Sequence, residues 1–521
     1  MKKGRIKIEK FARRSNQNRN ETKLTNTDTQ PIPISLNLSD NLQRIKEIFS
    51  DNDDFVIIHW RYGPEMKYTA FSIYFKTLIQ QKELNYMKES LQDLVTHEVG
   101  PGTMITPEDV MSFFERNGAS ANSHRLVEDF EKVVEKVVSG HLVIFFNQWD
   151  KALSYQALGI EMRQVTEPVT EPVVKGPRES TIENLDKNLG MLRVRLQSPR
   201  FKIRTFSLKG ETNTKVAYGY LDGIINPDIL AEFERRIGKL NEGEILETSY
   251  IEELIEDSTY SPFPQYRYTE RPDTAVAALL DGKIVVLVNG TGSILICPSR
   301  FVELLQSSED YYQRTAYSSL IRFLRMVAFG IALTLPSLYI ALSTFHPELI
   351  PTVLLLRILD TREDIPFPPF IEAFLMIFAF ELLREAGVRL PRPVGAAVSI
   401  VGALVIGEAA IEAGIASPIM VIVVSLTGIS SFALPQYNFA IALRILQLPF
   451  MLFATFLGGF GLMIAFILLW LHLVNLRSLG QPYLTPVEPF RPEQWRDVII
   501  RTPLKNVLRS PRRHHMRMRT K

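Results

Sequence analysis

The 521-residue chain contains a single cysteine, Cys297. One cysteine excludes an internal disulfide framework and any metal cluster that needs several thiolates. This scarcity fits a reducing compartment. We expect Cys297 to be a free thiol, buried in a strand.

Residues 1–34 lack the long apolar run of a secretory signal. They carry nine Lys or Arg against three acidic residues, and no apolar stretch of the required length follows. We expect this basic N-terminus to be disordered and cytosolic. It either contacts anionic lipid headgroups or is a solvated tail without a partner.

The chain also lacks a recognisable set of catalytic residues. Glu167 and Glu171 lie in a repeated Thr-Glu-Pro motif, and two carboxylates could act as general acid and base. No His, Ser or metal-ligand set surrounds them, so structural ion pairs with Arg178, Arg193 or Arg195 are the favoured interpretation.

The Asn-Gly-Thr-Gly stretch at 289–292 invites comparison with a phosphate-binding loop. It lacks the Lys and the Ser/Thr of a P-loop and the strand-to-helix context of a dinucleotide fold. A hairpin turn is the better interpretation. We therefore expect no enzymatic activity, no cofactor, no metal and no nucleic-acid partner.

Charge and hydropathy divide the chain into two halves. The mean hydropathy of +0.03 averages a charged region, residues 1–325, with an apolar region, residues 326–474. This pattern predicts an α/β soluble N-terminal region of two small domains, followed by an all-α polytopic membrane domain. The expected segments are a basic N-terminus at 1–34, domain 1 at 35–160, domain 2 at 161–307, a juxtamembrane coupling segment at 308–325, the transmembrane domain at 326–476 and a basic cytosolic tail at 477–521.

Periodicity and turn residues predict the elements of both domains. In domain 1 we expect helices at 41–49, 77–95, 107–116 and 124–138, and strands at 55–60, 67–75, 141–146 and 152–158. In domain 2 we expect helices at 180–196, capped by Ser180 or Thr181, and at 227–240, 251–256 and 271–280, with strands at 201–208, 214–221, 283–288 and 293–297.

Residues 309–325 are amphipathic and rich in tyrosine and arginine, as at a water–lipid boundary. Such a segment either couples the soluble region to the membrane or only anchors it. The apolar segments that follow are 326–345, kinked or broken near Pro336, then 365–383, 394–411, 415–433 and 448–476; the stretch 349–358 is too short to cross. Glu372 and Glu381 are costly in lipid unless they face protein or water.

Positive charge predicts that both ends of the chain are cytosolic, which requires an even number of crossings. The apolar segments number about five. Either 365–383 is re-entrant, or part of 435–447 also enters the membrane.

The apolar segment at 394–413 has no Lys, Arg, Asp, Asn or His and only two Glu. Its length, about 20 residues, suffices for about 30 Å of hydrocarbon. One helical stripe is lined by valines and ends in two acids: Val394, Val398, Val401, Val405, Glu408 and Glu412. The adjacent stripe has small residues that allow close helix packing, among them Gly395, Ser399, Gly402 and Ala409.

In a symmetric oligomer the valines would form a hydrophobic constriction with an acidic ring at one mouth, an arrangement found in cation pores. The alternative is a helix that faces lipid.

Several longer motifs resemble one family over about residues 35–505. They are TEPVTEPVVKGPRES (166–180), GYLDGIINPDIL (219–230), PFPQ (262–265), ERPD (270–273), LVNGTGSILICP (287–298) and the stretch from Leu390 to Pro435. Together they resemble the A subunit of the GerA family of spore germinant receptors.

This resemblance implies a protein of the inner spore membrane. It also implies a homo-oligomer in contact with membrane lipids, a transporter-like B subunit and a lipoprotein C subunit. The A subunit would be a nutrient-gated cation channel that triggers germination. The alternatives are an accessory of dipicolinate release, similar to the stage V sporulation AF protein, and a non-conducting membrane scaffold in which the acids pair with Arg384 or Arg444.

Overall fold

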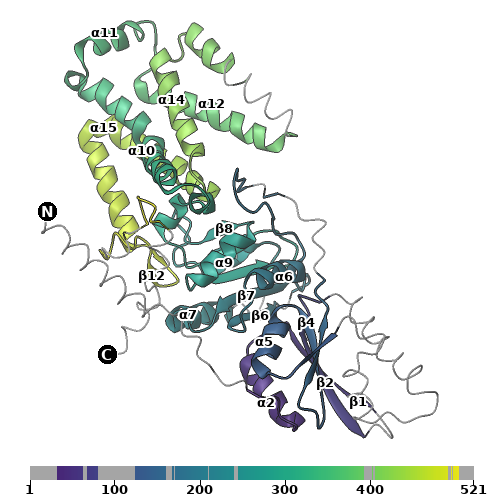
Figure 1. Cartoon of the computed structure of the whole chain (residues 1–521). Coiled ribbons are helices and arrows are strands. Elements are labelled where there is room, and N and C mark those ends of the chain that lie inside the picture. Colours follow the sequence, from purple (N-terminus) through teal and green to yellow (C-terminus); the bar gives the residue numbers. More distant parts are fainter. Residues whose placement is uncertain are drawn as a thin grey trace, which may run out of the picture. The chain divides into compact units, whose positions relative to one another are not determined.

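The computed structural model describes residues 32–62, 67–79, 124–159, 167–168, 170–208, 210–239, 244–391, 402, 405–490, 495 and 497–503 (Figure 1). The chain divides into two compact units. One comprises Met1–Ile160 with Gln197–Pro199, and the other comprises Glu161–Leu196 with Arg200–Lys521.

The first unit contains an antiparallel sheet with strand order β1-β2-β4-β5-β3. The strands are β1 (Phe55–Tyr62), β2 (Tyr68–Phe75), β3 (His124–Val127), β4 (His141–Phe146) and β5 (Ala152–Gln156), and the helices are α2 (Leu38–Ile48) and α5 (Phe130–Val138). Val133 and Val137 of α5 are fully buried, because the helix places one apolar face on the sheet.

The prediction of a helix at 124–138 is wrong for the first residues of that range. Residues 124–127 form the edge strand β3, which pairs with β5. Asp129 then caps α5, since its carboxylate accepts a hydrogen bond from the backbone N–H of Glu131 at 3.0 Å. The start of the helix expected at 77–95 is wrong, because residues 77–79 form a turn that ends in a bridge between Ile79 and Leu158. The rest of this helix and the one expected at 107–116 lie outside the described residues.

The second unit begins with an α/β domain whose antiparallel sheet has the order β6-β7-β9-β10-β8. Its elements are α6 (Leu185–Arg195), β6 (Phe201–Ser207), β7 (Lys215–Leu221), α7 (Pro227–Ile237), α8 (Thr248–Ile255), β8 (Arg267–Thr269), α9 (Pro272–Leu280), β9 (Ile284–Val288) and β10 (Ile294–Cys297). The two α/β sheets confirm the predicted fold class of the soluble region.

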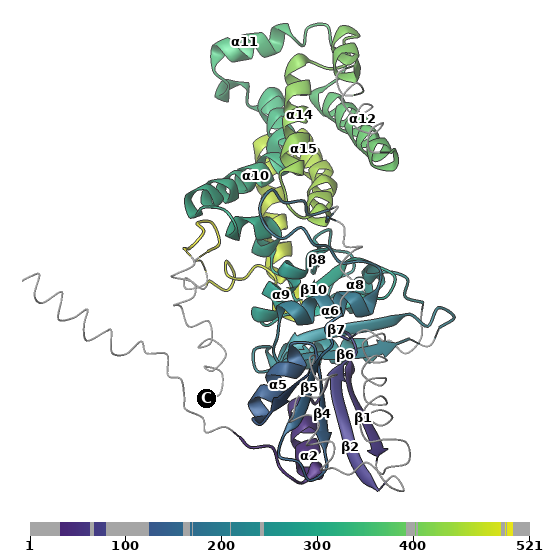
Figure 2. The same cartoon turned by 45° about the vertical axis from the view of Figure 1, so that its right-hand side comes forward.

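Alternation along β9 places helices on both faces of this sheet. Val285 and Leu287 pack with α6 and α9, whereas Val286 and Val288 pack with α7 and α8. Figure 2 shows α6 and α9 beside the strands. Cys297 is a free, buried thiol in β10, as expected. Burial raises the pKa of this thiol well above its usual value.

Two local expectations in this domain need correction. Helix α6 starts later than expected, and its cap is Asn184 instead of Ser180 or Thr181. The Asn184 side chain accepts from the backbone N–H of Lys187 at 3.0 Å. The short edge strand β8 has no counterpart among the predicted strands.

The second unit continues as a set of apolar helices. These are α10 (Thr315–Phe345), α11 (Thr352–Asp360), α12 (Pro369–Arg389), α14 (Pro418–Phe432) and α15 (Tyr437–Asn475), with the short 3-10 turns η4 (Phe301–Leu305), η5 (Ser308–Tyr311) and η6 (Pro347–Leu349). Residues 405–412 are also helical. A short hairpin, β11 (Arg477–Ser478) with β12 (Gln481–Pro482), follows α15. Helices α10 and α15 are long and apolar enough to cross a membrane, and 18-residue stretches within them have mean hydropathies of 1.8 and 2.4.

Helix α15 is a helical hairpin. Gly458 has φ 59° and ψ −136°, which interrupts the helix. The rings of Phe450 and Phe466, eight residues to either side, lie 5.2 Å apart. The arms have about 21 and about 17 residues, or about 31 and 25 Å, close to the thickness of a hydrocarbon core. The single span expected at 448–476 is therefore wrong in its bounds, because the chain reverses within it.

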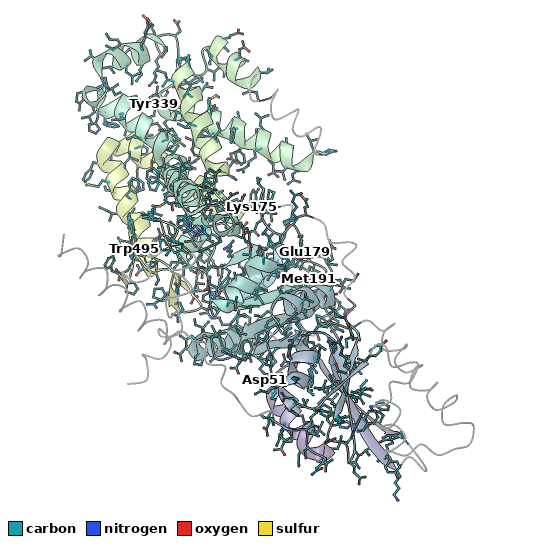
Figure 3. The ribbon with its side chains drawn as sticks, viewed as in Figure 1. Asp51, Lys175, Glu179, Met191, Tyr339 and Trp495 are labelled. Atoms are coloured by element: carbon teal, nitrogen blue, oxygen red, sulfur yellow. The ribbon has the colours of Figure 1, made fainter. Side chains whose placement is uncertain are left out.

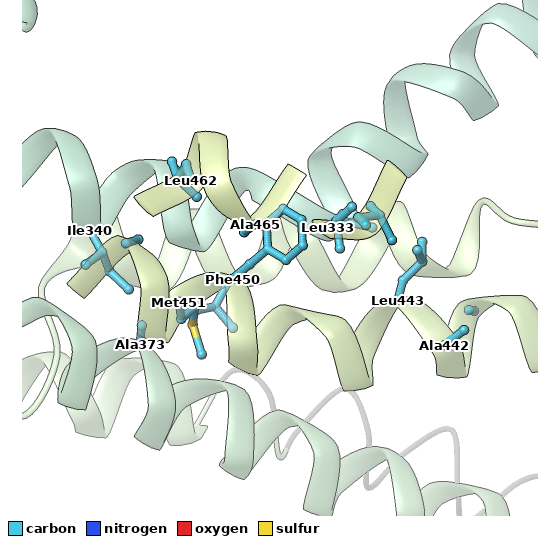
Figure 4. Close-up of a cluster of buried hydrophobic side chains, with 14 of the residues drawn as sticks. Leu333, Ile340, Ala373, Ala442, Leu443, Phe450, Met451, Leu462 and Ala465 are labelled. Carbon is cyan, nitrogen blue, oxygen red and sulfur yellow. The ribbon is translucent and has the colours of Figure 1, made fainter. Parts of the chain in front are cut away.

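The core of the helical region lies between α10 and the two arms of α15. Figure 4 shows Leu333 and Ile340 of α10 together with Leu443 and Phe450 of the first arm and Leu462 of the second. Tyr339 of α10 lies in the same region (Figure 3) and is buried.

Candidate functional site

The loop 258–265, which carries the PFPQ motif, joins the second α/β domain to both ends of the helical hairpin. The ring of Phe263 lies 6.1 Å from that of Phe439 in the first arm and 6.1 Å from that of His472 in the second. The hydroxyl of Ser261 lies 2.9 Å from Nε2 of His472. The two arm ends therefore meet at one aromatic residue of the soluble domain.

The Thr-Glu-Pro segment contacts the same end of the hairpin. Glu171 accepts a hydrogen bond from Gln436, just before α15, at 3.0 Å, and lies 3.5 Å from Arg267 of β8. Glu167 forms an exposed ion pair with Arg178 at 3.2 Å, one of the pairs predicted. Glu171 therefore ties the α/β domain to the start of α15.

A buried ionic cluster lies where the α/β domain continues into α10. Arg322 is 2% exposed and lies 3.1 Å from the carboxylate of Asp310 and 3.1 Å from that of Asp497. The hydroxyl of Tyr311 donates to Asp497 at 2.6 Å. Burial, together with this hydrogen bond, raises the pKa of Tyr311 to about 12, so that the hydroxyl remains a donor at neutral pH.

Arg322, expected at the water–lipid boundary, is buried against protein, and its position relative to a membrane stays a prediction. In the first turns of α10 the charged side chain of Arg322 faces the protein, while the side chains of Tyr317, Leu320 and Phe323 are exposed. No local pattern reveals this, because Asp497 follows Arg322 by 175 residues. Residues 497–503 belong to the region expected to form a tail.

The ends of the helices fix their relative directions. Phe345 and His346, at the end of α10, contact Gly458 and Gly459 at the tip of the hairpin. Phe329, earlier in α10, stacks on Phe439 at 5.7 Å. Helix α10 thus runs from the α/β domain toward the tip, parallel to the first arm of α15 and antiparallel to the second.

Helices α12 and α14 run back toward the α/β domain. Glu372 at the start of α12 contacts Ser417, which caps α14, and Phe380 packs on Gly428 and Phe432 further along both helices. The segment from 402 to 412 runs the other way, since Gly402 contacts Leu383. With α10 and the two arms of α15, the described residues outline six passes that alternate in direction.

Glu372 and Glu381, the two acids of the predicted apolar segment 365–383, are both paired. Glu372 is fully buried and accepts from the backbone N–H of Ser417 at 2.7 Å and from its hydroxyl at 2.5 Å, while Arg362 lies 3.8 Å away. Glu381 forms ion pairs with Arg384 and, at 3.7 Å, with Arg444. Both acids therefore face protein.

Only part of the predicted pore stripe lies in the described residues. Val394, Val398 and Val401, like the packing residues Gly395 and Ser399, lie outside them. Val405, Glu408 and Glu412 are described, and all three are exposed in the single chain.

The opposite side of this segment packs against its neighbours. A side chain added at Gly402 would overlap Leu383 of α12, and Gly407 lies next to Val421 of α14. Ala410 is buried in the helical core. Ala409, predicted to pack, is exposed in the single chain, and its packing against a second copy stays a prediction.

Two α/β sheets followed by alternating apolar helices define a class of proteins with a soluble N-terminal region and a helical, membrane-type C-terminal region. The family model "Bacillus/Clostridium GerA spore germination protein" matches residues 43–513. The chain belongs to this GerA family of spore germination proteins.

Individual relatives agree with this assignment. The chain is 40% identical to the uncharacterized membrane protein YfkQ of Bacillus subtilis (strain 168), over 93% of this chain and 92% of the relative. It is 39% identical to the B. subtilis spore germination protein KA, over 91% and 86%, and 36% identical to the B. subtilis spore germination protein A1, over 90% and 94%.

Among solved structures, the N-terminal domain of the A subunit of the Bacillus megaterium spore germinant receptor GerK3 matches with 25% sequence identity. The match has a TM-score of 0.40 and covers 52% of this chain and 98% of that domain.

Proposed function

We propose that this chain is the A subunit of a spore germinant receptor and that several copies form a nutrient-gated cation channel without enzymatic activity. One observation carries the proposal. Val405, Glu408 and Glu412 share one exposed stripe, and neither acid has an ion pair with another described residue. Acids inside a membrane domain are costly unless they face water or a partner.

The acids of the predicted apolar segment 365–383 contrast with this pair. Glu372 and Glu381 have cationic partners within the same chain. Because Glu408 and Glu412 lack such partners among the described residues, we infer that they face a water-filled axis shared between copies. The valines before them would then form the constriction, and the small residues would pack the helix against its neighbours.

In this proposal the protein lies in the inner spore membrane with both ends in the spore core. The six alternating passes support it, because an even number returns the chain to its starting side. The loop 258–265 and the buried cluster around Arg322 would transmit movement between the α/β domain and the helices. A transporter-like B subunit and a lipoprotein C subunit would complete the receptor.

Cation release from spores carrying the full-length protein tests the proposal. We expect Val405→Ala to cause leakage without nutrient and Glu408→Gln to change the ratio of potassium to sodium released. Val353→Ala is a matched control, since Val353 on α11 is 79% exposed and lies outside the stripe. Unchanged release in both stripe variants would remove this segment from the pore.

A non-conducting scaffold is the second candidate, supported by the ion pairs of Glu381 with Arg384 and Arg444. Purified protein in liposomes separates the two: a scaffold gives no cation flux under any nutrient condition. An accessory role similar to that of the stage V sporulation AF protein would instead leave nutrient sensing intact and slow the release of dipicolinate.

A further inference from the structure

Helix α12 and the first arm of α15 bring two arginines to one carboxylate. Arg384 pairs with Glu381 on its own helix, and Nε of Arg444 lies 3.7 Å from the Glu381 carboxylate. The Arg444 guanidinium also lies over the ring of Tyr437, 5.9 Å from its centre. With two guanidinium groups and one carboxylate, the cluster has a net charge of +1.

Several donors of this cluster are unused. Nη1 of Arg384 and both Nε and Nη1 of Arg444 are buried without a hydrogen-bond partner among the residues that the structure describes. The Arg444 side chain is only 9% exposed and that of Arg384 17%. A buried guanidinium with unfilled N–H groups is unfavourable, because it has left water without regaining its hydrogen bonds. Within the described part of the chain, these donors therefore lack an acceptor, and a negatively charged acceptor would neutralise the excess charge of the cluster.

We propose that Arg384 and Arg444 bind a phosphate oxyanion between α12 and α15. The planar guanidinium fork suits phosphate, since parallel N–H groups can donate to two oxygens at once. Such an anion fills the unused donors and cancels the excess charge. The proposal concerns lipid and ion binding and does not depend on whether the protein conducts cations.

The depth of the cluster favours a phosphate at the membrane surface. Arg444 is about 10 Å along the helix from Tyr437, where α15 begins. That end of α15 contacts the α/β domain through Gln436 and Phe439. The Glu381 side chain is 31% exposed, so one side of the cluster lies at the surface of the single chain. Basic pockets between helices at this depth bind lipid headgroups, and a free phosphate ion would offer the same chemistry.

Thermal unfolding of the full-length protein in detergent tests the site with three probes: phosphatidylglycerol, phosphatidylcholine and inorganic phosphate. We expect phosphatidylglycerol to raise the unfolding midpoint of the native protein by several degrees more than phosphatidylcholine does. Arg444→Gln should lose at least half of this difference. Arg357→Gln should keep it, because Arg357 is exposed on α11. A shift of the same size with inorganic phosphate alone would identify free phosphate as the source.

Glu381→Gln gives the sharper test, since it distinguishes anion binding from a purely structural role. Removing the competing carboxylate should tighten phosphatidylglycerol binding at least threefold, whereas a structural ion pair would only lose stability. This variant tests the proposal even if Arg444→Gln does not fold. Equal responses to phosphatidylglycerol and phosphatidylcholine in the native protein and in Glu381→Gln, with no response to phosphate, would overturn the proposal.

Discussion

The guanidinium of Arg322 lies 3.1 Å from the carboxylate of Asp497, although 175 residues separate the two in the chain. Both side chains are buried, and Asp310 pairs with the same arginine. Arg501 adds hydrogen bonds to the backbone carbonyls of Tyr311 and Gln313. Residues 497–503 therefore hold the start of α10 against the α/β domain.

Asp497→Ala should destabilise this junction. Removing one partner of a buried ion pair costs about 3–5 kcal/mol when a charge is left unpaired, and we expect about 2 kcal/mol because Asp310 remains. The measurement is the thermal unfolding midpoint of the full chain, with proteolysis of its C-terminal segment. Asp360→Ala is the control, since the Arg357–Asp360 pair is exposed and should contribute less than about 1 kcal/mol. Equal midpoints for the two variants would contradict the assignment.

Gly458 at the tip of the hairpin should not tolerate a side chain. Its backbone conformation is one that other residues avoid, and an added Cβ would lie 2.8 Å from Cβ of Phe345. We expect Gly458→Ala to cost about 3 kcal/mol or more, from backbone strain and overlap together.

Gly330→Ala in α10 is the matched control for this position. An added Cβ at Gly330 meets nothing within 4 Å, and alanine favours the helix by about 1 kcal/mol. The two variants should therefore shift the unfolding midpoint of the detergent-solubilised protein in opposite directions. A stable Gly458→Ala protein would show that α15 is not a tight hairpin.

The sequence predicts the sheet of the second α/β domain well, because its strands are apolar and its turns contain glycine. The strands β6, β7, β9 and β10 lie where the apolar stretches and the turn at 289–292 predict them. The edge strands β3 and β8 escape prediction, since three or four residues are too few to show a period. Their pairing is decided by neighbours elsewhere in the chain.

Only those features of the candidate site that depend on residues close together in the sequence can be predicted. The spacing of Val405, Glu408 and Glu412 alone places them on one stripe, and the structure leaves that stripe exposed. The reversal at Gly458 is hidden because hydropathy is continuous through it. The partners of Arg322 are hidden for a different reason, since a buried ion pair depends on chain segments far apart in sequence.

Glu372 should be essential for the start of α14. Its carboxylate accepts from both the backbone N–H and the hydroxyl of Ser417, at the N-terminal end of a helix, where negative charge is favoured. Glu372→Ala leaves these donors and Arg362 without the acid, and we expect a loss of about 3 kcal/mol.

Glu372→Gln keeps an acceptor for Ser417 and should lose about half as much as Glu372→Ala. The control is Glu385→Ala, because Glu385 pairs with Arg389 on an exposed face of α12. Unfolding midpoints in detergent measure all three variants. A ranking in which the control loses as much as Glu372→Ala would contradict this role.

Glu252 of α8 gives the α/β domain a pH dependence. Burial raises the pKa of its carboxyl to about 7, although the hydroxyl of Tyr268, which donates to it at 2.6 Å, opposes this shift. A carboxyl whose pKa is raised in the folded state contributes its full stabilisation at pH values below the pKa that it has in the unfolded chain. The contribution is lost as the pH rises from about 4.5 to about 7, and we expect a loss of about 2 kcal/mol.

Glu252→Gln cannot ionise and should therefore flatten this dependence and unfold at a higher temperature than the native protein at pH 8. Glu253→Gln, one residue further on an exposed position, should leave the profile as it is. Parallel midpoint profiles of the native protein and Glu252→Gln between pH 5 and pH 8 would show that this carboxyl ionises as readily in the folded chain as in the unfolded one.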